Sequence, residues 1–253
     1  MIDPDSRRRI AKGMVMIGDR PMLWHVMKSF ATYGHKDFIL ALGEGGRDIR
    51  CYFLQYHLQS HDIEVDLANP SPKQLNTTQE EDWTVKFVDT GLNAHTGGRI
   101  MRCSRYLDDQ LFLISYSDCL CNVNIGALID FHKQSGAVLT VTGVQPPSRF
   151  GTFFVNDSRV TGYSLDSRLS GIGGFVNGGF MVASKTLFGY LEPFNECNLE
   201  RDTFVRLVNE KKVAVYPHDG YWQALDTERD AQLLNTLYAN NQRPWLPSPG
   251  QMR

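Results

Sequence analysis

The sequence predicts an α/β fold in which helices flank a Rossmann-like, mostly parallel sheet. Two continuous apolar runs of strand length, at 38–42 and 111–116, are typical of strands that are buried on both faces. Segments with apolar residues at helical spacing alternate with these runs, as they do in the βαβ units of a parallel sheet. The chain has 253 residues, 42% of them hydrophobic, which is enough for one domain with a sizeable core.

The elements of the first half follow in order from apolar spacing and from helix and turn signals. Pro21 can occupy the first position of a helix, apolar residues follow it at helical spacing, and Gly34 ends it. Residues 62–82 are polar and irregular, and we expect a surface excursion there. The expected order is a strand or turn at 14–17, a helix at 21–34, strand 38–42, helix 49–58, strand 83–90, helix 96–107, strand 111–116, helix 125–134 and strand 138–144.

The pattern of predicted elements changes after Pro146-Pro147. Short, glycine-punctuated strands are expected at 151–155, 160–165 and 178–182, and they predict a smaller mixed-sheet lobe rather than further βαβ units. We therefore expect one domain, 1–253, with two parts and a tail. The remaining expected segments are helices at 199–209 and 227–240, a strand at 213–216 and a proline-containing tail at 244–253.

Charge and composition exclude several classes of protein. The formal net charge of −2 excludes a general polyanion binder, so no nucleic-acid partner is expected. No window approaches 18 unbroken apolar residues and the first residues lack the apolar core of a signal peptide, so neither a membrane span nor secretion is expected. The five cysteines are an odd number in apolar surroundings, which predicts reduced thiols in a cytoplasmic protein.

Two aspartates are the first candidates for chemistry. Asp118 directly follows the most hydrophobic predicted strand, and in an open parallel sheet ligands bind beyond the carboxyl ends of the strands. Asp226 lies just before a predicted helix. Two carboxylates that converge from different segments suit Mg²⁺, which prefers oxygen ligands and leaves room for water and phosphates. The alternative is a structural role for either residue, which at Asp226 would be capping of the helix.

Two further segments carry weaker signals. Thr96-Gly97-Gly98-Arg99 places a glycine pair at a turn from strand to helix, where backbone N–H groups can approach a phosphate or a base closely. A plain turn is the alternative. Lys12 follows the basic run Arg7–Arg9, and such runs usually form a solvated face. The histidine spacing and the Cys119-Leu120-Cys121 motif do not predict a zinc site, and no Gly-x-Ser-x-Gly motif occurs.

Several stretches together resemble the sugar-1-phosphate nucleotidylyltransferases, and most closely their glucose-1-phosphate cytidylyltransferase branch. The resemblance extends from about Lys12 to Trp245. It implies a nucleotide-binding core at about 12–145 and a sugar-binding part at about 146–243, and it leaves a homo-oligomer open. The stretches that carry it lie, in order, at 14–27, 88–91, 96–99, 116–118, 146–151, 176–180 and 222–230.

This resemblance also implies a reaction and a set of site residues. CTP and glucose 1-phosphate would give CDP-glucose, a precursor for surface polysaccharides, and pyrophosphate, with Mg²⁺ as cofactor. The sugar phosphate oxygen would attack the α-phosphorus of CTP in line, and the protein would contribute positioning and charge neutralisation. The implied residues are Lys12 and Arg168 as catalytic cations, Thr96, Gly97, Gly98, Arg99 and Ser117 at the nucleotide, Asn177 and Gly178 at the sugar, and Asp118 and Asp226 at the metal.

Three departures from the family pattern leave a second hypothesis open. The family begins with a strand and a phosphate-cradling loop, G-G-x-G-T-R-L, which these residues do not contain, so we expect the 253 residues alone to be marginally stable and inactive. A lysine in the family's F-x-E-K-P stretch has no counterpart at 163–168, where Arg168 is the available cation. Cys119 and Asn122 replace a glycine and an acidic residue. The alternative is a degenerate member that binds a nucleotide sugar or a partner subunit without catalysis.

Overall fold

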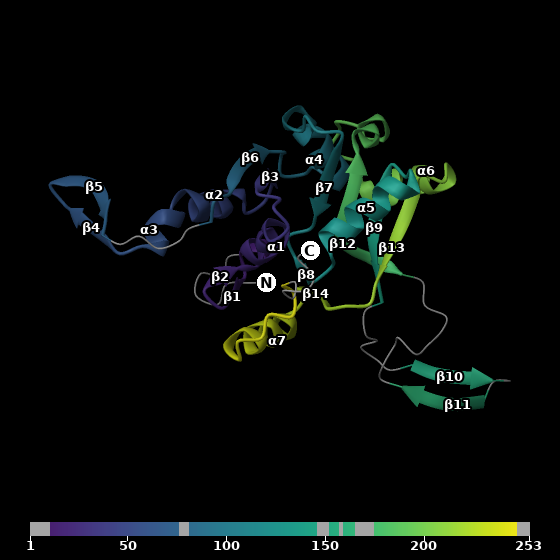
Figure 1. Cartoon of the computed structure of the whole chain (residues 1–253). Helices are drawn as coiled ribbons and strands as arrows, with labels where there is room; N and C mark the ends of the chain where they lie inside the picture. Colours follow the sequence, from purple (N-terminus) through teal and green to yellow (C-terminus); the bar gives the residue numbers. More distant parts are fainter. Residues whose placement is uncertain (1–10, 76–80, 146–151, 157–158, 165–174, 247–253) are drawn as a thin grey trace.

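The computed structural model describes residues 11–75, 81–145, 152–156, 159–164 and 175–246 (Figure 1). Strands and helices alternate along most of the chain, which confirms the predicted α/β class. None of the helices in the described part of the chain combines the length and the apolar character that crossing a bilayer requires.

The largest sheet has four strands in the order β13-β9-β12-β7. β13 runs parallel to β9, and β12 runs antiparallel to both of its neighbours, so this sheet is mixed and not mostly parallel as expected. Every residue of β9 is buried, because β9 has a partner on each edge and α5 packs on the sheet. The bounds are Leu111–Ser115 for β7, Leu139–Val144 for β9, Val176–Ser184 for β12, Val213–His218 for β13 and Ile125–Ser135 for α5.

A separate parallel pair is formed by β3 and β6, in register from Asp37↔Thr84 to Leu42↔Asp89. The expectation that 38–42 is buried on both faces is wrong for most of the strand, since Leu42 is buried but Ala41 is exposed. The cause is that, within the described residues, β3 pairs along one edge with β6 alone. The bounds of this part are Asp37–Leu42 for β3, Thr84–Asp89 for β6, Gly46–Leu54 for α2, Tyr56–Ser60 for α3, Thr96–Cys103 for α4 and Ser104–Tyr106 for the 3₁₀ turn η2.

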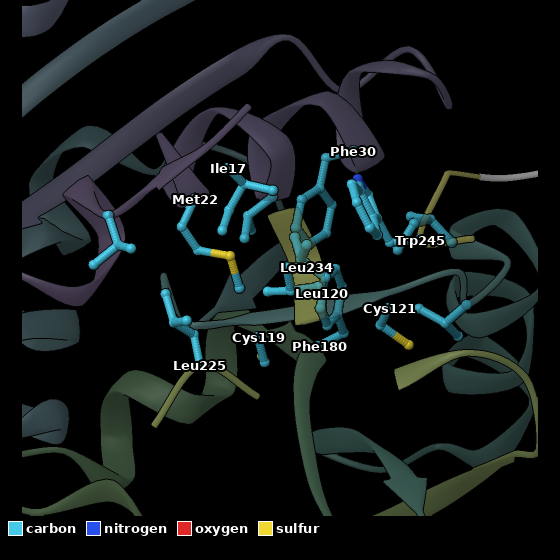
Figure 2. Close-up of a cluster of buried hydrophobic side chains, with 14 residues drawn as sticks. Ile17, Met22, Phe30, Cys119, Leu120, Cys121, Phe180, Leu225, Leu234 and Trp245 are labelled. Carbon is cyan, nitrogen blue, oxygen red and sulfur yellow. The ribbon is translucent and has the colours of Figure 1, made fainter. Parts of the chain in front are cut away.

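The hydrophobic cluster drawn in Figure 2 joins the start of the chain to its end. Met22, Val26 and Phe30, four residues apart on α1, face the strands β8 and β12, and the ring of Phe30 stacks on Phe180 at 5.1 Å. Trp245 is fully buried in the same cluster. The elements here are η1 (Lys12–Met14), β1 (Met16–Ile17), β2 (Arg20–Pro21), α1 (Met22–Ala31), β8 (Cys119–Cys121), β14 (Trp222–Ala224) and α7 (Glu228–Ala239).

Two hairpins lie apart from the main body in Figure 1. The excursion that was expected to be irregular contains the antiparallel strands β4 and β5, and the expected strands near 151–165 form the antiparallel pair β10–β11. Their bounds are Ile63–Asp66 for β4, Asn69–Gln74 for β5, Thr152–Asn156 for β10 and Arg159–Ser164 for β11; the remaining elements are the 3₁₀ turn η4 (Lys185–Tyr190), the π-helical turn η5 (Leu199–Thr203) and α6 (Phe204–Asn209).

Candidate functional site

A short antiparallel strand pair brings Asp118 and Asp226 together. In this pair Cys119, at the start of β8, lies opposite Ala224, at the end of β14. Asp118 precedes β8 at the same end at which Asp226 follows β14, and the N–H of Leu225 donates to the carbonyl of Asp118 at 2.8 Å. Pairing of the backbone therefore fixes the two carboxylates near each other, as the sequence predicts for a shared site.

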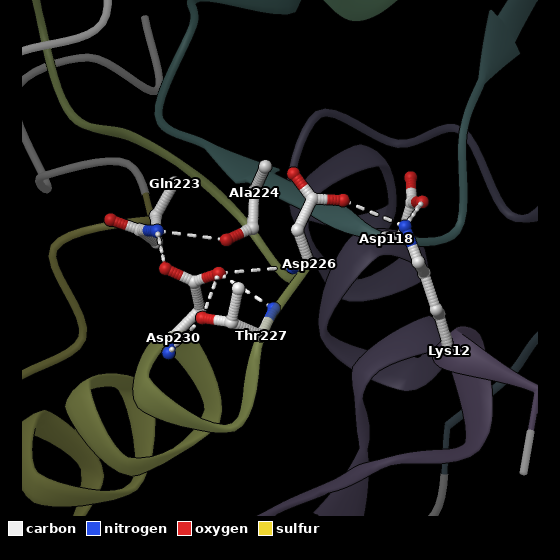
Figure 3. Close-up of polar contacts among 7 residues, drawn as sticks. All are labelled: Lys12, Asp118, Gln223, Ala224, Asp226, Thr227 and Asp230. Atoms are coloured by element: carbon white, nitrogen blue, oxygen red, sulfur yellow. Dashed lines mark hydrogen bonds and ion pairs between the residues drawn. The ribbon is translucent and has the colours of Figure 1, made fainter. Parts of the chain in front are cut away.

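Lys12 joins the two aspartates in Figure 3. Its Nζ donates to Oδ1 of Asp226 at 2.7 Å and to Oδ2 of Asp118 at 3.2 Å. The hydrogen bond to Asp226, followed by that to Asp118, raises the pKa of Lys12 above its ordinary value against the opposing effect of burial. One ammonium group thus partly neutralises two carboxylates that come from distant parts of the chain.

The helix cap next to Asp226 belongs to another residue. Thr227 caps α7, because its Oγ1 accepts the N–H of Asp230 while Oδ2 of Asp230 accepts the N–H of Thr227 at 2.8 Å (Figure 3). Asp230 also accepts the N–H of Asp226 at 3.1 Å, so it fixes the backbone beneath that carboxylate. The capping alternative for the Asp226 side chain is thereby removed, and this side chain remains directed at Lys12.

The glycine pair at the start of α4 packs against the segment before η5. A Cβ on Gly98 would lie 2.3 Å from the carbonyl oxygen of Phe194, and one on Gly97 would lie 2.6 Å from Sγ of Cys197. The N–H of Gly98 already donates to the carbonyl of Cys197 at 3.0 Å. Close packing therefore accounts for both glycines, and the nucleotide-binding role expected for them stays a prediction.

A carboxylate that the sequence analysis missed, Glu200, connects the predicted nucleotide and sugar residues. Its Oε2 accepts from Oγ1 of Thr96 at 2.7 Å and its Oε1 accepts from the hydroxyl of Tyr116. The amide of Asn177 donates to the same hydroxyl at 3.3 Å. Burial, followed by the bond to Glu200, raises the pKa of Tyr116, which keeps the phenol protonated as a donor. Glu200 belongs to no recognisable motif and is 84 residues from Tyr116, so its position could be found only from the fold.

Arg99 is held at the carboxyl ends of β3 and β6. Its Nη1 donates to Oγ1 of Thr90 at 2.7 Å and its Nη2 to the carbonyl of Leu92 at 3.3 Å. A Cβ on Gly43 would lie 2.4 Å from Nη1, so this glycine leaves room for the guanidinium. Burial, with Arg102 nearby, lowers the pKa of Arg99, but a guanidinium remains charged. The nucleotide-binding role expected for Arg99 stays a prediction, since these contacts are to the loop after β6.

The remaining predicted residues differ in their surroundings. Ser117 is exposed and lies against Gly13, where a Cβ would be 3.0 Å from its Oγ. The carbonyl of Gly178 accepts from Nε1 of Trp222 at 2.8 Å, so this backbone is fixed before any sugar binds. Arg168 and the stretch 146–151 lie outside the described residues.

The donor set at Asp118 and Asp226 is suited to Mg²⁺ rather than to zinc. Within the ranges that the structure describes, no group of three or more His, Cys, Asp or Glu side chains gathers to hold a metal. Mg²⁺ needs fewer protein ligands, because it is usually bound by one or two carboxylates together with waters and substrate phosphates. Asp118 and Asp226 meet that requirement, because they are two carboxylates whose side chains remain 33% and 52% exposed.

Curated relatives cover nearly the whole chain. A probable glucose-1-phosphate cytidylyltransferase from Bacillus subtilis is 36% identical over 236 residues, which are 93% of this chain and 91% of the relative. A glucose-1-phosphate cytidylyltransferase from Salmonella typhimurium is 35% identical over 235 residues, which are 92% and 90% of the two chains. No family model matches the sequence.

Solved structures show the same fold at low identity. UDP-glucose pyrophosphorylase from Acinetobacter baumannii aligns with a TM-score of 0.65 and 16% identity over 96% of this chain and 90% of that one. HddC from Yersinia pseudotuberculosis, complexed with GMP-PN, aligns with a TM-score of 0.62 and 19% identity over 91% of each chain. The architecture is therefore that of the nucleotide-diphospho-sugar transferases, as the sequence predicted.

Proposed function

We propose, since the chain belongs to the glucose-1-phosphate cytidylyltransferase family, that it transfers a cytidylyl group from CTP to glucose 1-phosphate. The products are CDP-glucose and pyrophosphate. One structural observation carries the proposal: Lys12, Asp118 and Asp226, from three distant segments, meet at one point. That arrangement supplies a cation and two hard anionic ligands, which are the groups that transfer of a nucleotidyl group requires.

The reaction exchanges one phosphorus–oxygen bond for another. A phosphate oxygen of glucose 1-phosphate attacks the α-phosphorus of CTP, and the bond from that phosphorus to the β-phosphate breaks, so that pyrophosphate leaves with its electron pair. Asp118 and Asp226 would hold Mg²⁺, which supplies neutralisation of phosphate charge when it is bound. No covalent step on the protein is needed, and the remaining work of the chain is positioning.

The residues around Glu200 are suited to this positioning. Thr96 and Asn177, which the family resemblance assigns to nucleotide and sugar, are linked through Glu200 and the hydroxyl of Tyr116. Tyr116 is also two residues from Asp118 in the sequence. We expect this linkage to keep the two substrate-binding segments in a fixed relation to the carboxylates.

A second candidate is a family member that binds the nucleotide or nucleotide sugar without transferring it. The observation in its favour is the absence of lysine at 163–168, where Arg168 is the available cation. A guanidinium is planar and more weakly hydrated than an ammonium group, so it does not reproduce the contacts of lysine at a phosphate.

A product assay separates the two candidates. CTP, UTP, GTP and ATP are each incubated with glucose 1-phosphate or mannose 1-phosphate and Mg²⁺, and products are identified by ³¹P NMR. The 253 residues are assayed alone and with an upstream extension that bears the family's G-G-x-G-T-R-L loop, because we expect the residues alone to be inactive. The extended protein should give CDP-glucose from CTP and glucose 1-phosphate, with the rate lost in Asp118→Asn and retained in Asp130→Asn, a surface aspartate that pairs with Lys133. CTP binding by the extended protein without product supports the second candidate. Absence of both binding and turnover contradicts both.

A further inference from the structure

The contact between Lys12 and the two carboxylates has the geometry of a cation site that is filled by a side chain. One nitrogen atom lies within 2.7 Å of an Asp226 oxygen and 3.2 Å of an Asp118 oxygen (Figure 3). We propose that Lys12 is a built-in counter-cation: its ammonium neutralises Asp118 and Asp226 before the metal arrives, and it must leave for a divalent cation to bind both. This inference rests on the proposed role of the two aspartates as metal ligands.

Repulsion between the carboxylates explains why a counter-cation is useful there. Backbone pairing of β8 with β14 fixes Asp118 and Asp226 close together whether or not a ligand is present. Two like charges at such a separation destabilise each other, and an ammonium group between them offsets that cost. Lys12 therefore offsets the negative charge of the pair and holds both carboxylates at one point.

The two cations exclude each other for reasons of space and charge. A Mg²⁺ ion at about 2.1 Å from one oxygen of each carboxylate would occupy the region in which Nζ of Lys12 now lies. A positive charge of two and a positive charge of one also repel each other at that distance. Metal binding must therefore break at least one of the two lysine contacts.

Lys12 can leave without unfolding its surroundings. Its side chain is 42% exposed, and the residue belongs to a three-residue 3₁₀ turn rather than to a long helix. The four-carbon stem of lysine is flexible, so the ammonium can turn toward solvent or toward an anion. A triphosphate that arrives beside the carboxylates offers such an anion.

Metal and triphosphate then bind with positive coupling. The metal displaces the ammonium, the triphosphate accepts it, and each ligand lowers the cost of binding the other. By linkage, the factor by which the triphosphate raises metal affinity equals the factor by which the metal raises triphosphate affinity. Substitution of Lys12 by an uncharged residue removes the competitor, so metal affinity without nucleotide should rise, and the coupling should shrink.

Binding of Mn²⁺, followed by the electron paramagnetic resonance signal of the free ion, tests this without any turnover. The proteins are the wild type, Lys12→Met, Lys12→Gln as a second uncharged variant, and Lys36→Met, which loses a surface ion pair with Asp82. Without nucleotide, we expect roughly two- to tenfold tighter Mn²⁺ binding in both Lys12 variants, the range that loss of exposed ion pairs allows. Lys36→Met should bind like the wild type. Addition of CTP should reduce the difference in Mn²⁺ affinity between the Lys12 variants and the wild type.

The outcomes separate this inference from the proposed function. Lys12 variants that fold, as judged by circular dichroism, and bind Mn²⁺ no tighter than the wild type overturn the inference and leave the metal role of the aspartates standing. Loss of the same binding in Asp118→Asn assigns the signal to this site. Absence of Mn²⁺ binding in every protein, with and without CTP, overturns both the inference and the proposed metal site.

Discussion

The strand β9 of the four-stranded sheet and the strand β3 of the β3–β6 pair differ in burial. Of the two, only β3 was expected to be buried on both faces, and the same expectation for 111–116 is also wrong, since within β7 only Phe112 is buried. Every residue of β9 is buried, whereas in β3 only Leu42 is buried and Ala41 is exposed. β3 is the more apolar of the two by sequence, but β9 has a partner strand on each edge and β3, within the described residues, on one. An apolar run thus indicates capacity for burial, while the neighbours decide how much of it is realised.

The residues of the candidate site also differ in the burial of the strands beside them. Asp118 and Asp226 are attached to β8 and β14, and β8 packs in the fully buried cluster with Phe180 of β12. Arg99 is bound instead to the loop beyond β6, on the less buried pair. The carboxylates therefore lie beside the more buried strands and the guanidinium beside the less buried pair.

A matched pair of leucine substitutions should show the largest difference in stability between β9 and β3. Leu139→Ala in β9 removes a fully buried side chain and should cost about 2–5 kcal/mol in the free energy of unfolding. Leu40→Ala in β3 removes a half-buried one and should cost about 1 kcal/mol, since less surface returns to water. Urea unfolding measures both. Equal losses would contradict the difference in burial between the two strands.

Removal of the Arg99 guanidinium, beside the β3–β6 pair, should lower the affinity for CTP more than the stability of the fold. Arg99→Ala is expected to weaken CTP binding by about 1.5–3 kcal/mol, the value typical of a hydrogen bond to a charged group. Calorimetric titration with CTP measures the change, and Arg201→Ala, an exposed arginine paired with Asp202, serves as control. Unchanged CTP affinity in Arg99→Ala would count against a nucleotide-binding role.

The hydroxyl of Tyr116 should matter more than a similar hydroxyl at the surface. Tyr116→Phe leaves Glu200 and Asn177 without their shared partner and should destabilise the protein by about 1–3 kcal/mol. Tyr190→Phe removes a comparable bond to the exposed Glu210 and should have a smaller effect. Thermal unfolding compares the two. Equal losses of stability in Tyr116→Phe and Tyr190→Phe would contradict this expectation. In an active preparation, Tyr116→Phe should also raise the KM for glucose 1-phosphate more than it lowers kcat.

Acid should destabilise the protein through two buried histidines, His25 and His132. Burial lowers the pKa of His25 on α1 and of His132 on α5 below the ordinary value of 6.5. Above pH 6.5 both the folded and the unfolded chain carry neutral imidazoles. As the pH falls below 6.5, the unfolded chain binds protons first, so the free energy of unfolding declines until the lower folded-state pKa values are passed. Urea unfolding on either side of pH 6.5 measures the decline, and it should be smaller in His132→Gln. A free energy that rises on acidification through this range would contradict the assignment.

The convergence of Asp118 and Asp226 could be predicted, because Asp118 directly follows a predicted strand and the family resemblance assigns both residues to one metal. Their shared contact with Lys12 confirms that they lie together. The pairing that brings them together was missed, because β8 and β14 have three residues each and show no periodicity. The fold class was predicted from the apolar runs at 38–42 and 111–116, which have the length of strands.

Other contacts depend on packing that no local pattern encodes. The role of Gly97 and Gly98 at a phosphate stays a prediction, whereas their close packing against Phe194 and Cys197 could not be foreseen. Glu200 lies in a segment that was expected only to be helical, so its contact with Thr96 could not be foreseen. Lys12 was expected only as a catalytic cation, and its ion pairs with both aspartates are seen only in the folded structure.

The claim that Asp118 and Asp226 act as one unit is tested most directly by a double-mutant cycle on Mn²⁺ affinity. The four proteins are the wild type, Asp118→Asn, Asp226→Asn and the double variant, each titrated in the presence of CTP. If the two carboxylates share one ion, each single substitution should remove most of the binding, and the double variant should lose little more than either. Losses that add in full, as for independent sites, would contradict the shared site.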